Sequence, residues 1–214
     1  MKKTTKILSL IMLMVVAMAL VGCGKKDTSD QLSGTWELTF VYSTLIEDEL
    51  GSDYADFDED LFVTVYMTFN EDGTCKRYVD EDELAPQLQA YIESLAQFDA
   101  NLAYEILESQ GYSKAEADEA AQQELGMSLY DFSLSQFSNA VTAADIAGEF
   151  YFSGVFEAKG NELHMDEYQV EDNVFDEFKV EGNTLTLNPP TGGEYEETGI
   201  EGYDYPFVFT KSAQ

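Results

Sequence analysis

The densest group of potential metal ligands in this chain lies in residues 47–60, which contain eight acidic side chains. Calcium binds clustered carboxylate and carbonyl oxygens, so this segment has the chemistry of a weak extracellular calcium site. The EF-hand spacing is absent, because no glycine follows the acidic residues at the required position. A calcium site and a solvated acidic loop are the two interpretations, and we expect the loop. The acidic residues are Glu47, Asp48, Glu49, Asp53, Asp56, Asp58, Glu59 and Asp60.

His164 is the only histidine, so a transition-metal site or a Ser-His-Asp hydrolase would have to use it. It alternates with Leu163 and Met165, which predicts an exposed position on the polar face of a strand. The chain has no Gly-x-Ser-x-Gly, no phosphate-binding glycine loop and no His-Glu-x-x-His motif. Carboxylate pairs of the glycosidase type carry no information among 42 acidic residues. We therefore predict a non-enzymatic protein with no catalytic residue, no metal and no cofactor.

The two cysteines have different surroundings. Cys75 lies in a strand-like stretch, and we expect it to be buried and unreactive. Cys23 follows a basic start with three lysines and an apolar run over residues 7–21, the pattern of a secretory signal peptide. This run is shorter than the ~20 residues that a membrane-spanning helix needs. The alternatives are a plain transmembrane helix and an ordinary cleaved signal that leaves Cys23 as a bare thiol.

The end of this run, Leu20-Val21-Gly22-Cys23, resembles the lipobox of bacterial lipoproteins. The resemblance implies that residues 1–22 are a lipoprotein signal peptide and that Cys23 becomes a lipidated N-terminus carrying acyl chains such as palmitate. Two acyl chains hold a protein on a bilayer where one does so only marginally. We expect residues 23–33 to form a flexible polar tether and the protein to lie at the extracytoplasmic face of the cell membrane. With Cys23 lipidated, Cys75 has no intrachain partner for a disulfide.

The charge balance excludes one class of partner. The chain has 42 acidic and 11 basic residues, a formal net charge of −31. Three of the basic residues and none of the acidic ones lie in residues 1–22, which leaves −34 for the remainder. Phosphate binding needs clustered Lys and Arg, so nucleic acid is not an expected partner. Like charges also argue against contact between the globular part and anionic lipid.

Alternating apolar residues predict strands on both sides of a helical segment. Residues 34–42, 61–70 and 74–79 read as strands, with a tight turn at Asn70-Glu71-Asp72-Gly73 between the second and third. The alternation returns after Gly148, with hairpin turns at Gly160-Asn161 and Gly182-Asn183. Tyr205, Phe207 and Phe209 indicate the last strand, with Pro206 at its start or edge. About eight strands follow, and we favour a closed barrel over a two-sheet sandwich because closure removes exposed edges.

Residues 82–147 have a helical period and predict three or four helices. Pro86 is tolerated in a first turn, so the first helix is predicted to begin near it, and Gly111 is its natural stop. Ser113-x-x-Glu116 is a capping box for a second helix, which Gly126 closes. Weaker starts follow at Ser128 and Thr142. The first helix carries an apolar stripe that either packs on the sheet, as we expect, or forms a partner groove. The stripe consists of Leu84, Leu88, Tyr91, Leu95, Phe98, Leu102 and Ile106.

Three motifs together resemble bacterial lipocalin-like lipoproteins. They are Gly34-Thr35-Trp36 preceded by Leu32, the hairpin Thr68-Phe69-Asn70-Glu71-Asp72-Gly73-Thr74, and the Gly-Asn-x-Leu-x-Leu strand of residues 182–187. The resemblance covers residues 32–79 and 148–211. It implies an α+β fold, mainly β, in which an up-and-down antiparallel barrel over residues 34–211 is interrupted by a helical insertion at 82–147. The chain departs from the family in the size of this insertion, in lacking a second signature, and in lacking an Arg near the last strand to cover Trp36.

A group of aromatic residues could line a cavity for an apolar ligand or simply fill the barrel, and we favour the filled core. The group consists of Trp36, Phe40, Tyr42, Phe150, Phe152, Phe207 and Phe209.

These observations lead to one functional expectation and one alternative. We expect a membrane-anchored, non-enzymatic lipoprotein that binds a small apolar or amphipathic ligand in its barrel. The alternative is an interaction or assembly module with a solid barrel that binds another protein of the cell envelope. Beyond Cys23 as the lipid attachment site, the sequence assigns no binding residue.

Overall fold

The structure is a computed structural model that describes residues 25–43, 46, 50–166, 174–191 and 205–213. The predicted signal peptide at residues 1–22, Cys23, and the three acidic residues at positions 47–49 lie outside this described part. Within it, no helix combines the length and the apolar character needed to cross a membrane.

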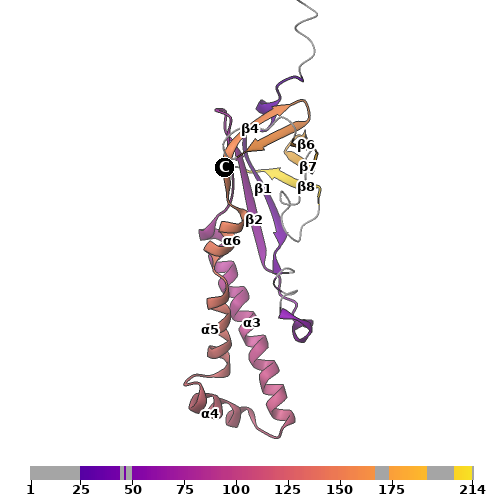
Figure 1. Ribbon diagram of the computed structural model, residues 1–214. Helices are drawn as coiled ribbons and strands as arrows, with labels where there is room; N and C mark the ends of the chain where they lie inside the picture. Colours follow the sequence, from indigo (N-terminus) through magenta and orange to yellow (C-terminus); the bar gives the residue numbers. More distant parts are fainter. Residues whose placement is uncertain (1–24, 44–45, 47–49, 167–173, 192–204, 214) are drawn as a thin grey trace, which may run out of the picture.

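Eight antiparallel strands form a closed barrel in which each strand pairs with the next along the chain and the last pairs with the first. The predicted fold class is therefore confirmed: an α+β, lipocalin-like up-and-down barrel with a helical insertion (Figure 1). The strands are β1 Gly34–Val41, β2 Phe62–Phe69, β3 Thr74–Val79, β4 Phe152–Lys159, β5 Glu162–Asp166, β6 Phe175–Glu181, β7 Thr184–Thr191 and β8 Phe207–Lys211.

The alternation in the sequence decides which side chains enter the barrel. In β1, Trp36, Leu38 and Phe40 are buried while the residues between them are less so. Trp36 pairs with Met67 and Leu38 pairs with Val65, so the buried faces of β1 and β2 continue one another. Paired residues in neighbouring strands lie on the same face of a sheet, and this register can be followed around the barrel.

The two ends of the barrel are built differently. Short turns at residues 70–73, 160–161 and 182–183 join β2 to β3, β4 to β5 and β6 to β7, all at one end. Gly73, Gly160 and Gly182 have positive φ in these turns, as the predicted turn chemistry requires. The strand ends that the longer connections join lie at the opposite end. We call the end with the short turns the closed end and the opposite end the mouth.

The N-terminal segment covers the closed end. The 3₁₀ helix η1, Ser29–Gln31, leads to Leu32, which is fully buried and accepts a 2.6 Å hydrogen bond from Nε1 of Trp36. The backbone N–H of Thr28 donates to the carbonyl of Ala158 at 2.9 Å. Within the predicted tether, residues 25–33 therefore include several that contact the barrel. The β4–β5 hairpin extends beyond the end of β3. Its backbone groups at Ala158 and Gly160 therefore form hydrogen bonds with the N-terminal segment.

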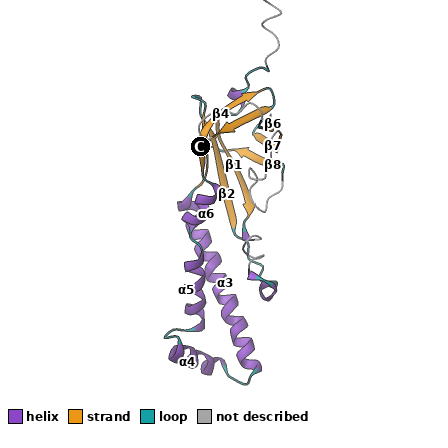
Figure 2. Ribbon diagram, viewed as in Figure 1, coloured by secondary structure: helices purple, strands orange, loops and turns teal. Residues whose placement is uncertain are grey.

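The helical insertion stands on the mouth as a long arm. Its helices are α3 Glu81–Ser109, α4 Lys114–Glu124, α5 Leu129–Ala140 and α6 Ala143–Phe150. Helices α3 and α5 lie side by side, α4 crosses the far end, and α6 returns to the barrel (Figures 1 and 2). We call α3, α4 and α5 the helical arm. The helices begin one residue before and end three residues after the predicted insertion at 82–147.

The caps that the sequence suggested form, with one correction. Ser113 with Glu116 and Thr142 with Asp145 make capping boxes. The start of α3 was misplaced, because the side chain of Asp80 accepts from the backbone of Asp82 and Glu83 and caps the helix there. Pro86 therefore lies in the second turn, where it removes one backbone hydrogen bond.

Tyrosine hydroxyls fasten the helices to the barrel. Tyr66 of β2 donates to Glu83 of α3 at 2.7 Å. Tyr54, in the connection between β1 and β2, donates to Asp99 of α3 at 2.5 Å. The ring of Phe57 in the same connection packs edge-on against Tyr91 at 5.6 Å between centroids. The described part of this connection therefore contacts α3 between Tyr91 and Asp99 and helps to fix the direction of the arm.

Candidate functional site

The half of the barrel next to the closed end is filled by side chains. Five inward-facing residues there have at most 1% of their surface exposed. The rings of Phe69 and Phe156 meet at 4.8 Å between centroids. This half is packed as a core, so a binding site in the barrel has to lie toward the mouth. The five residues are Trp36, Phe69, Leu163, Leu185 and Phe209.

Arg77 brings a charge into this apolar interior. It pairs with Met67 of β2 and Phe152 of β4, and its neighbours on the same face of β3, Cys75 and Val79, are buried. Its Nε donates to the carbonyl of Phe150 at the end of α6, at 3.0 Å. Burial lowers the pKa of the guanidinium, and this shift is opposed by the nearby Tyr205 and Asp176. Arg77 thus faces the interior directly beneath α6.

Asp176 is the opposite charge. It pairs with the buried Leu163 of β5, which places its side chain inside the barrel, and only 7% of its surface is exposed. Burial raises the pKa of its carboxyl group to about 6, against the attraction of Arg77. Asp176 makes no hydrogen bond or ion pair with any residue that the structure describes. Two opposite charges therefore face one interior without forming a salt bridge.

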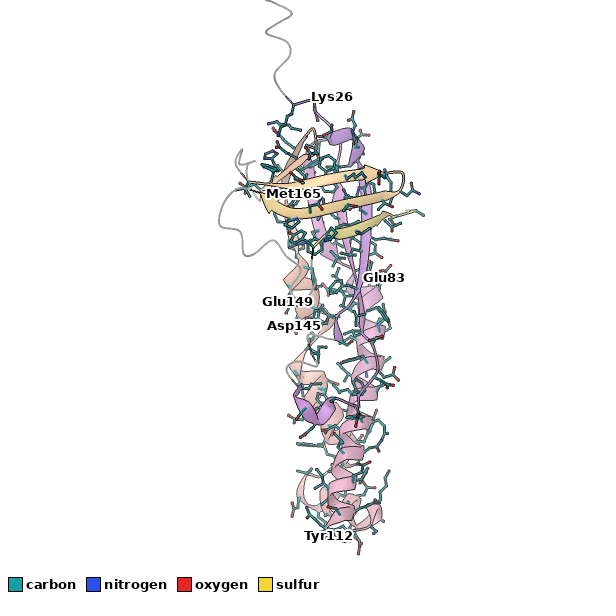
Figure 3. All side chains as sticks on the ribbon, turned by 90° about the vertical axis from the view of Figure 1, so that its right-hand side faces the viewer. Lys26, Glu83, Tyr112, Asp145, Glu149 and Met165 are labelled. Carbon is teal, nitrogen blue, oxygen red and sulfur yellow. The ribbon has the colours of Figure 1, made fainter. Side chains whose placement is uncertain are left out.

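Helix α6 closes the mouth on one side of this pair. The ring of Phe150 packs against Phe40 at 5.7 Å and against Tyr42 at 6.2 Å between centroids. The hydroxyl of Tyr42 donates to Glu149 of α6 at 2.9 Å. Figure 3 shows Glu149 at the junction between the barrel and the arm. The helix thus holds a fixed aromatic wall beside Arg77.

Some inward-facing residues near this wall remain partly accessible. Phe152 pairs directly with Arg77, and Met165 of β5 pairs with Phe156 of β4. Phe152, Met165 and Arg77 itself are half-buried, in contrast to the sealed residues of the closed end. The candidate site is therefore the mouth half of the interior, with apolar walls and two separated charges. Protein sites for small amphipathic ligands have this composition, mostly apolar with a few placed polar groups.

The predicted aromatic group belongs largely to the core. Six of its seven members are buried in one continuous hydrophobic cluster, which favours the filled-core interpretation for them. The seventh, Phe152, lies half-buried beside Arg77 and can contribute to a binding site.

The acidic loop shows no metal geometry in its described part. Asp53, Asp56, Asp58, Glu59 and Asp60 are all exposed. Over the described residues, no group of three His, Cys, Asp or Glu side chains is placed to hold a metal ion. The other three predicted ligands, at positions 47–49, lie outside the described residues.

The prediction of an exposed His164 is wrong. Its side chain does lie on the outer face of β5, but only 3% of the residue is exposed. The ring of Phe175 lies at 5.4 Å between centroids, and Glu162 is next to it on the same face. Lys25 from the N-terminal segment pairs with Glu162 and lies over Phe175. Strand alternation cannot reveal that another segment covers the outer face.

Cys75 is buried as predicted. Only 2% of its surface is exposed, and burial raises the pKa of its thiol to about 11. A thiol with this pKa is almost entirely protonated at neutral pH and is therefore unreactive.

Comparison with protein-family models, with curated proteins and with solved structures found no match for this chain.

Sequence reasoning missed Arg77 and Asp176, and their signals differ. Arg77 stands two residues from both Cys75 and Val79, so the alternation of β3 was enough to place it inside. Asp176 had a weaker signal, because it shares a face with Phe178 and Val180 while its neighbour Phe175, on the other face of β6, is also apolar.

Lys211 was also missed. Its Nζ lies 5.1 Å from the centre of the Trp36 ring and donates to the carbonyl of Ser33 at 2.9 Å. Lys211, rather than an Arg, therefore supplies the cation that covers the Trp36 ring.

Proposed function

We propose that this protein is a non-enzymatic lipoprotein, anchored at the extracytoplasmic face of a bacterial cell membrane through lipid on Cys23, whose barrel binds a small amphipathic ligand at its mouth. The observation that supports binding is the separated pair of Arg77 and Asp176 inside an otherwise apolar interior. Burying unpaired charge costs free energy. Proteins keep such costly groups mainly at functional sites.

Displacement of an environment-sensitive apolar dye tests binding. We expect saturable dye uptake, because the mouth half of the interior is apolar and partly accessible. Arg77→Leu should change the affinity for the dye, because it replaces the interior charge with an apolar side chain. Lys76→Leu is the matched control, since Lys76 is the next residue of the same strand and is exposed. Absence of saturable uptake by the folded protein would show a solid barrel and contradict the proposal.

Incorporation of labelled palmitate tests the anchor. Cells that produce the full chain should give a labelled protein, and Cys23→Ser should abolish the label. Cys75→Ser is the control, because the only other cysteine is buried inside the barrel and should leave the label unchanged. Label retained in the Cys23 variant would contradict lipidation at this residue.

The helical arm favours a second candidate, an assembly module of the cell envelope. Four large apolar side chains are exposed on or next to its helices, and exposed apolar side chains that gather into one patch are typical of docking sites. Asp99 of α3 accepts from Ser133 of α5 at 2.5 Å, so the two helices can be joined by a short loop in place of residues 100–132. If this shortened protein loses an envelope partner and retains dye uptake, the arm is the interaction module. The exposed residues are Ile106, Tyr112, Leu125 and Phe132.

A further inference from the structure

The charges inside the barrel restrict the chemistry of its occupant. Arg77 and Asp176 together are neutral, yet each faces the interior without the other as a salt-bridge partner. An occupant that satisfies only one of them leaves the other as an unpaired charge in an apolar surrounding. Such a charge is costly, and the cost is greatest where water is excluded.

We propose that the mouth binds a zwitterionic amphipathic molecule, with an acid group and an amine close together on a short apolar body. This inference rests on the proposed ligand binding and specifies the class of ligand.

The acid group of the ligand is expected to bind Arg77. Its Nε is already used by the carbonyl of Phe150, which fixes the orientation of the guanidinium. No hydrogen bond joins its two Nη groups to the described residues, and a guanidinium edge of this kind pairs well with a carboxylate. The bond to Phe150 therefore leaves Arg77 oriented for binding.

The amine of the ligand is expected to bind Asp176. An ionised carboxyl group accepts hydrogen bonds and donates none, so its partner must be a donor or a cation. The described residues supply none, although Asp176 is buried against Leu163. An ammonium group on the ligand would pair with this carboxylate while the acid group pairs with Arg77.

Singly charged ligands fit less well. An anion pairs with Arg77 but meets the like charge of Asp176, in a chain whose remainder after residue 22 carries −34. A cation pairs with Asp176 and meets Arg77. Only a zwitterion neutralises both groups and adds no net charge to the interior.

The packing limits the apolar body to a short one. The sealed residues of the closed end, from Trp36 to Phe209 around the barrel, leave no accessible surface for a long chain. On β4 and β5, near the mouth, Phe152 and Met165 are the inward-facing apolar residues that remain half-buried. The body therefore lies against these two side chains near the mouth.

Calorimetric titration with three matched compounds tests this class. They are 2-aminooctanoic acid, octanoic acid and octylamine, which share one chain length and differ only in their charged groups. The titrations use the full-length chain in lipid nanodiscs at pH 7.5, with empty nanodiscs as the blank. We expect 2-aminooctanoic acid to bind at least about tenfold more tightly than the other two, since each charge-assisted pair is worth that much.

Variants separate the two contacts. Arg77→Gln should weaken binding of 2-aminooctanoic acid about tenfold or more, and Asp176→Asn should reverse the preference toward octanoic acid. Lys76→Gln is the control and should change neither affinity. Equal or tighter binding of octanoic acid by the unmodified protein would contradict the proposal that the ligand is a zwitterion. No binding of the three compounds alongside saturable dye uptake would overturn the ligand class and leave the proposed function standing. No dye uptake would instead overturn the proposed function.

Discussion

Asp176 carries a carboxyl group into a barrel interior that is lined mainly by apolar side chains. Burial raises its pKa from 3.8 to about 6. Between these values the folded protein holds a proton that the unfolded chain has released. The free energy of unfolding therefore falls as the pH rises through this window, by about 3 kcal/mol from this residue alone.

We predict that Asp176→Asn removes this loss, because asparagine carries no titrating charge. Urea unfolding at pH 4 and pH 7.5 should show that stability falls by about 2.5 kcal/mol less in the variant than in the unmodified protein, because part of the effect already lies below pH 4. The comparison of two pH values cancels the contribution of the other carboxyl groups. A variant with the same pH dependence as the unmodified protein would mean that Asp176 is paired and that the site is not under electrostatic strain.

Lys211 at the closed end makes a second prediction at this scale. Lys211→Met should lower the free energy of unfolding by about 1 kcal/mol, because the cation over Trp36 and its bond to Ser33 are both lost. Lys211→Arg should retain most of the stability. Lys179→Met is the control, because Lys179 pairs only with exposed Glu181 and should stay within about 0.5 kcal/mol. Equal effects of the two Met substitutions would show that the contact with Trp36 contributes nothing.

At the scale of elements, the helical arm is held together unevenly. Near the barrel, α6 buries Ile146 and Phe150 in the main core. At the far end, α4 buries only Ala117 and Ala121. Alanine removes little apolar surface from water, so α4 contributes little packing energy.

We therefore predict that α4 opens first. In hydrogen exchange followed by mass spectrometry, its amides should exchange faster than those of α6 and of the paired strands β1 and β2. Tyr104→Phe should accelerate exchange in α4 further, because it removes the hydrogen bond to Asp118 of that helix. Exchange in α4 as slow as in β1 would contradict this picture of a weakly held tip.

Sequence patterns predicted correctly those features of the elements that depend on a few neighbouring residues. The turn glycines, the capping boxes and the stop at Gly111 each depend on a few neighbouring residues, and all of them form. Pro86 was misread because the cap at Asp80 outweighs the loss of one hydrogen bond. The predicted apolar stripe of α3 extends further along the helix than its burial does. Its first residues, from Leu84 to Leu95, enter the core, while Ile106 is 59% exposed because no barrel lies beside that part of the helix.

At the scale of the whole molecule, the N-terminal segment and the arm tip lie at opposite ends of a long body. Figure 3 shows Lys26 at one extreme and Tyr112 at the other. The 29 residues of α3 alone span about 43 Å. Four of the basic residues, Lys25, Lys26, Lys159 and Lys211, belong to the closed end, whereas residues 81–150 hold fourteen acidic residues and one basic one.

With the proposed lipid anchor at Cys23, this asymmetry predicts how the protein stands on a membrane. Only Gly24 separates Cys23 from the segment that packs on the barrel, so the closed end should lie next to the bilayer. An anionic bilayer repels the acidic arm and should turn it outward. Fluorescent labels at Glu71→Cys, in a turn of the closed end, and at Ser109→Cys, on the arm, should show strong and weak energy transfer to a membrane dye. Buried Cys75 should not take the label. Strong transfer from both positions would mean that the protein lies flat.

How far the sequence could predict the site also depends on this scale. Alternation and turn chemistry predicted the strands and their order, and the removal of exposed edges favoured barrel closure. Neither argument predicted that Arg77 on β3 and Asp176 on β6 face the same interior, because this depends on the register around the whole barrel. The burial of His164 likewise depends on a distant segment, which contributes Lys25.

Native mass spectrometry of residues 24–214, after incubation with an extract of the cells that produce the protein, tests the central claim most directly. We predict a discrete added mass on the unmodified protein and on Lys76→Gln, and its loss from a variant that combines Arg77→Gln with Asp176→Asn. An apo mass for the unmodified protein under all conditions would contradict ligand binding. Such a result would point to a solid barrel that serves as a base for the helical arm.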